Sequence, residues 1–385
     1  MLRYGPPNGA VAIAPAVPTA VVAIAATPAT VAGGPAEPIH EDVNRRLREA
    51  TRRKESVLLT GVTMGGGPAA WAIEAHLQAG QKVFATAEAA KTLNDDLETV
   101  AAMGIHLVSE DEARRLPDSI RRLHMADFDP IALRYALAPF GLSLHGLDAV
   151  AVAVFDHGAA PAGVSDRRFR FDYLDERIRA ENRLSAFAYP AAQIPPALTR
   201  LAAVAKSAGE IPAPLVVMDT AAAAILGATL DPMLSLHGEN LIVNIGNFHT
   251  LAFRLGAEGI RGVFEHHTGF LNPEKLASLL TALAAGTLTN VAVFDDNGHG
   301  ALLYTDSPLP MDHPDFNVVV TGPRRNMLRS SALKPYFAVP FGDMMIAGCF
   351  GLLAAMADVM PELGETLRAS LVGGAGQGTP PWEIE

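Results

Sequence analysis

The chain contains little cysteine and few aromatic residues. Cys349 is the single cysteine among 385 residues, which excludes a disulfide within the chain. It also excludes sites that need several cysteines, namely cysteine-based zinc sites and iron–sulfur clusters. Aromatic residues make up only 6% of the chain, whereas glycine (34 residues) and proline (28) are frequent, a composition typical of a loop-rich α/β protein.

Positive charge is also in short supply. The chain carries 30 Lys and Arg against 41 Asp and Glu, and its formal net charge is −11. This balance argues against nucleic acid as a partner, because proteins that bind it usually present a basic surface. The composition predicts a cytoplasmic protein and indicates no particular protein partner.

The first part of the chain lacks charge altogether. Residues 9–34 are rich in Ala and Val and contain no charged side chain, and their length would suit a membrane span. Several prolines interrupt this stretch, however, and it lacks the basic start and unbroken apolar centre of a secretory signal. We therefore expect residues 1–38 to form a low-complexity tail with short strands at 10–14 and 20–25, and a membrane role is not favoured.

A glycine-rich loop follows the first strongly apolar strand. After a predicted strand at 57–60, the segment "TMGGGP" leads into a helix that begins at Pro68. A strand, a glycine-rich loop and a helix N-terminus together present backbone N–H groups to an anion. The loop lacks the Gly-Lys-Ser/Thr of a P-loop, so a turn that only needs glycine torsions is the alternative. The candidate ligand-binding residues here are Thr63, Gly65, Gly66 and Gly67.

Further strands and helices alternate up to a second polar turn. We expect a strand at 82–86, a helix at about 88–103, a strand at 105–108 and a capping box that begins at Ser109. The apolar strand "AVAVAV" then ends in Asp156-His157-Gly158. Open α/β sheets bind ligands beyond the carboxyl ends of such strands, which makes Asp156 and His157 site candidates. Alternatively, the pair caps the following turn.

The last third of the chain predicts an antiparallel meander and two small-residue helices. Residues 218–230, capped by Asp219 or Thr220, form the first helix, in which Gly227 permits close packing. The expected elements after it are the strands "LIVNIG", "HTLAFRL" and "GIRGVFEHH", a helix at about 273–285, strands near 291–295, 301–304 and 317–322, and a long helix at 343–360. This order is that of a ribonuclease-H-like unit.

The arrangement resembles the actin-like ATPase superfamily. The resemblance rests on "DTAAAAILGA" before "LIVNIGNFHTLAF", followed by "VVVTGPRR" and "PFGDMMIAGCFGLLAAM". In that superfamily the two helices correspond to connectors between domains. The hairpin corresponds to the second phosphate-binding loop, and "TGPRR" to the loop that binds adenosine.

A closer resemblance extends from about residue 56 to 360. The segments "LLTGVTMGGGP", "DHGAAPAGVSDRRFRF", "NIGNFHTLAF", "EHHTGFL" and "TGPRR" are similar to those of a family labelled as a pyruvate formate-lyase activating enzyme. Such activases hold a [4Fe–4S] cluster on a Cys-x-x-x-Cys-x-x-Cys motif, which a single Cys349 cannot supply. We therefore expect neither an iron–sulfur cluster nor radical activase chemistry.

The resemblance implies two ribonuclease-H-like domains, of which the first lacks its initial strand. No Asp-x-Gly-x-Gly-Thr type of loop precedes Ser56, so the chain is expected to start late relative to its family and to turn over nucleotide weakly. The implied division is a tail at 1–38, a first domain at 39–237 onto which 344–370 packs back, a second domain at 238–343, and a tail at 371–385.

The resemblance also implies a small phosphorylated ligand or a nucleotide, with ATP and Mg²⁺ as the expected cofactors. The catalytic candidates are Asp156, His157 and Asn244. Asn244 stands where the superfamily has an Asp that engages Mg²⁺, so cation binding and hydrolysis should both be weak. The implied ligand-binding residues, besides those of the glycine-rich loop, are Gly246, Asn247, His249, Thr250, Gly322, Arg324 and Arg325.

Two other functions remain open from the residues. One is a metal-dependent enzyme built on Asp156, His157, His249, His266 and His267, since imidazole and carboxylate suit zinc, iron or manganese. No pair of these residues has the helical spacing of a recognised motif, and the identity of a metal cannot be read from them. The other is a regulatory or scaffold protein that has lost its nucleotide chemistry, which the Asn at 244 would suit.

Overall fold

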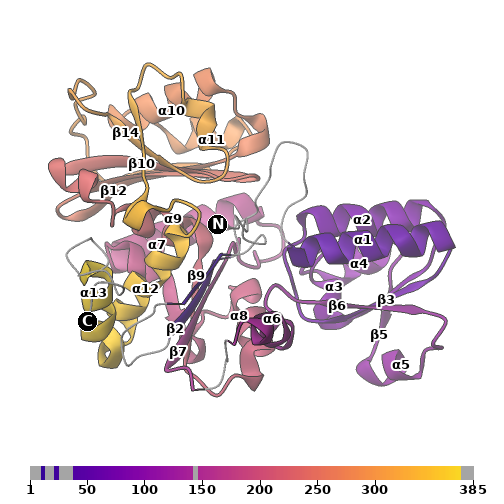
Figure 1. Cartoon of the computed structure of the whole chain (residues 1–385). Helices are drawn as coiled ribbons and strands as arrows, with labels where there is room; N and C mark the ends of the chain where they lie inside the picture. The colour runs from indigo at the N-terminus through magenta and orange to yellow at the C-terminus, as the bar shows by residue number, and fades with distance from the viewer. Residues whose placement is uncertain (1–9, 14–20, 26–37, 142–145, 374–385) are drawn as a thin grey trace.

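The computed structural model describes residues 10–13, 21–25, 38–141 and 146–373. These residues form a mixed α/β fold in which strands gather into three sheets (Figure 1). Among them, no helix combines the length and the apolar character needed to cross a membrane.

The central sheet has the strand order β1-β2-β7-β9-β8. Its strands are β1 (Ala10–Ile13), β2 (Val21–Ala25), β7 (Ala149–Val154), β8 (Ala188–Pro190) and β9 (Leu215–Asp219). Strands β2, β7 and β9 are parallel, and β1 and β8 are antiparallel at the two edges. Strands β1 and β2 confirm the expected short strands in the first part of the chain. All six residues of β7 are buried, because helices cover both faces of the sheet there.

The meander sheet has the strand order β13-β12-β11-β10-β14-β15. Its strands are β10 (Glu239–Ile245), β11 (His249–Gly256), β12 (Gly259–His267), β13 (Gly300–Leu303), β14 (Val318–Thr321) and β15 (Pro335–Phe337). The antiparallel meander expected from the sequence is confirmed, and β14 pairs with β10 in parallel. Helix α10 (Pro273–Ala284) contributes buried leucines to the core on one face of this sheet.

The outer sheet is parallel throughout and has the order β5-β4-β3-β6. Its strands are β3 (Val57–Gly61), β4 (Val83–Thr86), β5 (His106–Val108) and β6 (Arg121–Met125). Helices α1 (Pro38–Arg53) and α2 (Gly67–Gln78) share its hydrophobic core. The capping box at Ser109 begins α5 (Glu110–Arg115) as expected. The range 39–237 therefore contributes strands to two sheets, namely all of the outer sheet and β7, β8 and β9 of the central sheet.

One predicted helix and one predicted strand need correction. The segment 88–103 forms two short helices, α3 (Ala87–Ala90) and α4 (Leu97–Ala102), because the Asp96 side chain caps a new helix by accepting from the Glu98 N–H. The segment near 291–295 is a helix, α11 (Asn290–Asp295), and not a strand. Its alternating valines suggested a strand, but the Thr289 hydroxyl accepts from the Ala292 N–H and caps a helical turn.

Two small-residue helices cross at the junction of the central and meander sheets. They are α9 (Thr220–Ala228), capped by Asp219, and α12 (Ala347–Val359). A Cβ added to Gly227 would lie 1.7 Å from the Ala347 carbonyl oxygen, and one on Gly351 would lie 1.9 Å from the Ala223 oxygen. The close packing expected at Gly227 is therefore confirmed. Residues of both sheets and both helices share one hydrophobic core. Helix α7 (Asp166–Ala180) also packs there.

Substituting Gly227 by Ala tests this contact. In most helices a Gly-to-Ala change stabilises, because alanine has the higher helix propensity. Here the methyl group would overlap the α12 backbone, so we expect the free energy of unfolding to fall by about 2 kcal/mol or more. The control is Gly209→Ala, since no atom of the described residues lies within 4 Å of a Cβ at that position. Urea unfolding measures both changes, and equal stability of the two variants would contradict the tight crossing.

Candidate functional site

A cleft of about 350 Å³ lies where the three sheets meet. Its walls come from the carboxyl ends of β3 and β7, from the start of α9, and from the turn between β10 and β11. Parallel sheets bind ligands at such strand ends, and the volume falls in the range of small-molecule sites. The structure thus brings together these expected site residues: Thr63, Gly65, Gly66, Gly67, Asp156, His157, Asn244, Gly246, Asn247 and His249.

The outer-sheet wall is made by the glycine-rich loop before α2. The Gly65 N–H points to the Asp127 carboxylate, with both oxygens at 3.2 Å, and Arg200 pairs with that carboxylate. The Thr63 hydroxyl donates to the Glu88 carbonyl oxygen at 3.2 Å. These contacts hold the loop beside the cleft. Lys91 adds a cation to the same wall.

The turn after β7 places its two polar side chains differently. The Asp156 carboxylate is buried and accepts the N–H groups of Gly158 (2.8 Å) and Leu201 (2.9 Å). This is the turn-capping arrangement that the sequence left as an alternative to a catalytic role. Burial raises the pKa of Asp156, although these two N–H groups oppose the shift. His157 instead reaches toward the meander sheet.

The β10–β11 turn uses part of its hydrogen-bonding capacity internally. The Gly246 N–H, expected to bind phosphate, donates to the His249 carbonyl oxygen at 2.9 Å and closes the turn. The Thr250 side chain is fully buried, and its hydroxyl pairs with that of Thr268 at 2.9 Å. The residues that the structure does not bring to the cleft wall are Thr250, Gly322, Arg324 and Arg325; Pro323 lies there in their place.

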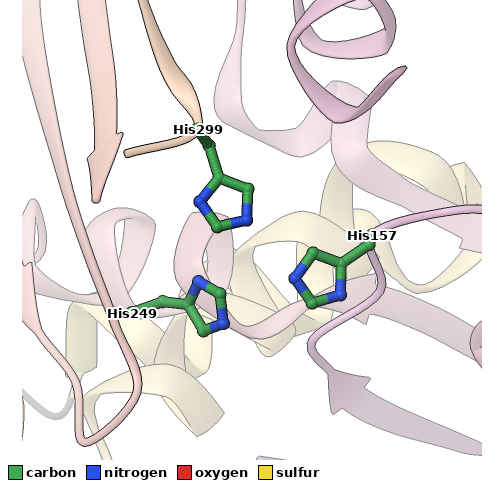
Figure 2. Close-up of side chains that lie close together, drawn as sticks. All are labelled: His157, His249 and His299. Carbon is green, nitrogen blue, oxygen red and sulfur yellow. The ribbon is translucent and has the colours of Figure 1, made fainter. Parts of the chain in front are cut away.

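Three histidines from distant parts of the sequence converge at one end of the cleft. His157 follows β7, His249 begins β11, and His299 precedes β13. One ring nitrogen from each lies within 4.8 Å of the others, and Figure 2 shows the three rings facing a common centre. The His249 ring stacks on Phe155, with the ring centroids 4.2 Å apart. The His249 ring is therefore held by packing as well as by its backbone position.

A buried carboxylate lies behind two of these rings. Glu265 Oε1 is 3.0 Å from His249 Nδ1 and 3.6 Å from His299 Nδ1, the second distance being too long for a hydrogen bond. The other oxygen accepts from Arg170 Nε at 2.6 Å. Arg170 also donates to Asp219 at 3.0 Å and to the Asp156 carbonyl oxygen at 2.8 Å. One arginine thereby joins α7 to the ends of β7 and β9 and to β12.

Burial decides the charge state of most of these groups. Burial, followed by the neighbouring His249, lowers the pKa of His157 well below its ordinary value. Burial lowers the pKa of His299 to about 3 and that of His267 to about 4. Burial would raise the pKa of Glu265, but Arg170 and the surrounding imidazoles outweigh it, so that pKa lies well below its usual range. Burial likewise opposes the charge of Arg170, and Asp219 and Glu265 reverse the effect and raise its pKa.

The histidine set differs from the one expected. His266 and His267 do not face the cleft together, because neighbouring residues of a strand point to opposite faces of its sheet. The His266 ring lies within 3.3 Å of Asp296 instead. The His267 ring stays near His299, with the centroids 4.6 Å apart. His299 and Glu265 were not among the site residues predicted from the sequence. The one sequence feature that could have indicated His299 is the Asn-Gly-His-Gly run before a strand.

The donor set determines which ions the cluster suits. Imidazole nitrogens favour zinc, iron, nickel or copper, whereas magnesium prefers carboxylate, carbonyl and water oxygens. Three histidines with a carboxylate behind them are also the composition of many metal sites, in which the carboxylate orients a ligand ring.

A family model described as "Putative pyruvate format-lyase activating enzyme (DUF1786)" matches residues 64–327. This match covers more than half of the chain. The chain belongs to this family. No curated protein and no solved structure matches it. The family segment contains Glu265, Arg170 and all three clustered histidines.

The Arg170 network makes a stability prediction. Replacing Arg170 by Met would leave Glu265 and Asp219 buried without their shared counter-charge, so we expect a loss of about 3–5 kcal/mol in the free energy of unfolding. The matched control is Arg168→Met on the same helix, whose partner Asp172 is 70% exposed and whose loss should cost under about 1 kcal/mol. Chemical denaturation compares them, and a similar small loss in both variants would contradict the network.

Proposed function

We propose that this chain binds a nucleotide or another small phosphorylated molecule in the cleft, on a fold of the actin-like ATPase kind. The observation that carries the proposal is the convergence of the glycine-rich loop, the β7 turn and the β10–β11 turn on one cleft. Loops of these three kinds, brought together from separate sheets, are well suited to surround a ligand with several phosphate oxygens.

The strand orders support the fold assignment. In the meander sheet, β10 is flanked by antiparallel β11 on one side and by parallel β14 on the other. In the central sheet, β2 occupies the corresponding position, with antiparallel β1 on one side and parallel β7 on the other. This similarity is what two ribonuclease-H-like units would show. The α9–α12 crossing between the sheets suits the connector role that the resemblance implies for these helices.

The central sheet also indicates how the first unit could form without the initial strand that the resemblance implies to be missing. Strand β2 lies beside β7, where an initial strand of the unit would lie, so its neighbour's backbone groups are paired. Among the described residues, β1 is the single strand on the side of β2 that faces away from β7. In the meander sheet, three strands (β11, β12 and β13) lie on the corresponding side of β10. We therefore propose a shortened first unit in which β2 replaces the initial strand.

The residues at the cleft do not fit Mg²⁺ at the position where the superfamily would hold it. Asn244 provides a neutral amide at the end of β10, and the buried Asp156 carboxylate is engaged by two backbone N–H groups. A hard divalent cation favours charged oxygen ligands with room for water. The proposed function is therefore ligand binding, with weak or no Mg²⁺-dependent turnover.

We do not propose the radical activase chemistry that the family description names. A radical activase needs several cysteines for its cluster, and the chain has one. Cys349 lies buried in α12, within the core shared by the central and meander sheets. A scaffold role without any ligand remains the competing function, and ligand titration decides between the two.

Lys91 provides the first test. Calorimetric titration of the full chain with ATP, ADP and AMP should detect one ligand per chain, bound more tightly as phosphates are added. Lys91→Met should weaken binding by about 10-fold or more, since a hydrogen bond to a charged group contributes about 1.5–3 kcal/mol. Lys206→Met is the matched control, because Lys206 also pairs with Glu88 but does not line the cleft. Absence of binding for all three nucleotides would favour the scaffold role.

Asn244 provides the second test. Asn244→Asp should strengthen nucleotide binding in the presence of Mg²⁺, because a carboxylate supplies the charge that a hard cation prefers. Asn272→Asp is the control: it adds the same charge at the cap of α10, where Asp serves as well as Asn. The readout is the ratio of dissociation constants with and without Mg²⁺. An unchanged ratio in Asn244→Asp would count against the assignment of this turn as a phosphate loop.

A further inference from the structure

We propose that His157, His249 and His299 bind one transition-metal ion, with Glu265 orienting His249 and an open coordination position facing the cleft. This inference goes beyond nucleotide binding, because it concerns a separate metal centre made of imidazole ligands. The observation behind it is the convergence of three rings from three segments (Figure 2). One nitrogen of each ring lies within 4.8 Å of the other two.

The burial of His299 is the first line of support. This side chain is 1% exposed, and neither of its ring nitrogens has a hydrogen-bond partner among the residues that the structure describes. Leaving buried polar atoms unsatisfied costs free energy, and nearly all such atoms in folded proteins find a partner. A metal ion bound between the rings would satisfy one of these nitrogens. Nearby Glu265, which is 3.6 Å from the other, would need only a small shift to satisfy it.

The Glu265 carboxylate supplies the orientation that a metal site needs. A hydrogen bond between Glu265 and His249 Nδ1 fixes the proton on that nitrogen and leaves Nε2 as the ligand atom. Arg170 holds Glu265 in place from the opposite side at 2.6 Å. The carboxylate therefore remains charged and correctly placed, as the partners of histidine ligands in metal sites generally are.

The position of the cluster determines where further ligands can bind. His157 and His249 line the cleft, whereas the buried His299 is not among the residues that line it. Three protein ligands leave a fourth tetrahedral position, which is the usual arrangement when a metal binds water or substrate. That position faces the cleft, so a phosphate or carboxylate oxygen of a bound molecule would coordinate the ion directly.

The experiment uses the full chain, stripped of metal with a chelator and titrated with Co²⁺ or Zn²⁺ in the absence of nucleotide. We expect one ion per chain and visible Co²⁺ absorption bands typical of a four- or five-coordinate site. Azide or inorganic phosphate should shift these bands by entering the open position. Because no nucleotide is present, the result does not depend on the proposed nucleotide function.

Variants assign the ligands. His299→Phe keeps a planar ring of similar shape without ligand atoms, and we expect it to fold and to lose more than about 100-fold in metal affinity, since even orienting residues contribute about 10- to 100-fold. His249→Ala should behave in the same way. The control is His313→Ala, since His313 is partly exposed and packs against His237 and Phe316.

Three outcomes would overturn the proposal or part of it. The site is wrong if the stripped protein binds no Co²⁺ or Zn²⁺ at one ion per chain. The ligand assignment is wrong if a folded His299→Phe protein retains wild-type affinity, or if His313→Ala loses as much. The open position is wrong if neither azide nor phosphate changes the Co²⁺ spectrum. Nucleotide binding that persists in His299→Phe would leave the proposed function intact.

Discussion

The buried pairing of Arg170 with Glu265 and Asp219 is the interaction on which the geometry of the site depends. One guanidinium on α7 lies 2.6 Å from Glu265 on β12 and 3.0 Å from Asp219 at the end of β9. It therefore links the meander sheet to the central sheet through hydrogen bonds at the ends of their strands. Burying three charges is costly, and the arrangement is stable only because each charged group meets its partners at hydrogen-bond distance. The histidines and the β7 turn are positioned around this centre.

The cleft combines features that usually belong to different kinds of site. Its glycine-rich loop and hairpin turn resemble phosphate-binding elements, whereas one end holds three imidazoles and lacks the carboxylate expected for magnesium. The Asn at 244 and the histidine cluster are consistent with each other, because a neutral amide and a group of imidazoles both lack the charged oxygen atoms that magnesium prefers. On the proposed account, the metal ion and the phosphate loops would bind different parts of one ligand.

Local patterns in the sequence predicted the elements and several of the site loops. The apolar run of β7 and the short polar turns between the apolar strands of the β10–β12 meander were sufficient to predict these elements. The small residues around Gly227 indicated a close helix crossing. The helix α11 was mistaken for a strand, since alternating valines outweighed the capping signal of Thr289. The outer sheet was not separated from the central one, because βαβ periodicity is the same whether or not consecutive strands join one sheet.

The side chains that complete the site were harder to predict. His299 lies 50 residues beyond His249 and 142 beyond His157 in the numbering, so only the register of β12 with β13 brings it near. Glu265 is the single acidic residue of β12, and its low pKa and fixed position depend on Arg170, which lies on a helix distant in the sequence. Conversely, Thr250 and Gly246 looked available for a ligand, but they form hydrogen bonds to Thr268 and to the His249 carbonyl oxygen.

Anomalous X-ray diffraction from crystals soaked with Zn²⁺ would locate a metal ion bound by the three histidines. We expect one strong peak at about 2.0–2.1 Å from a ring nitrogen of each of His157, His249 and His299, the usual zinc–imidazole distance. The peak should have open space on its cleft side. Zinc found only on exposed side chains, with the three rings still apart and His299 unligated, would contradict it.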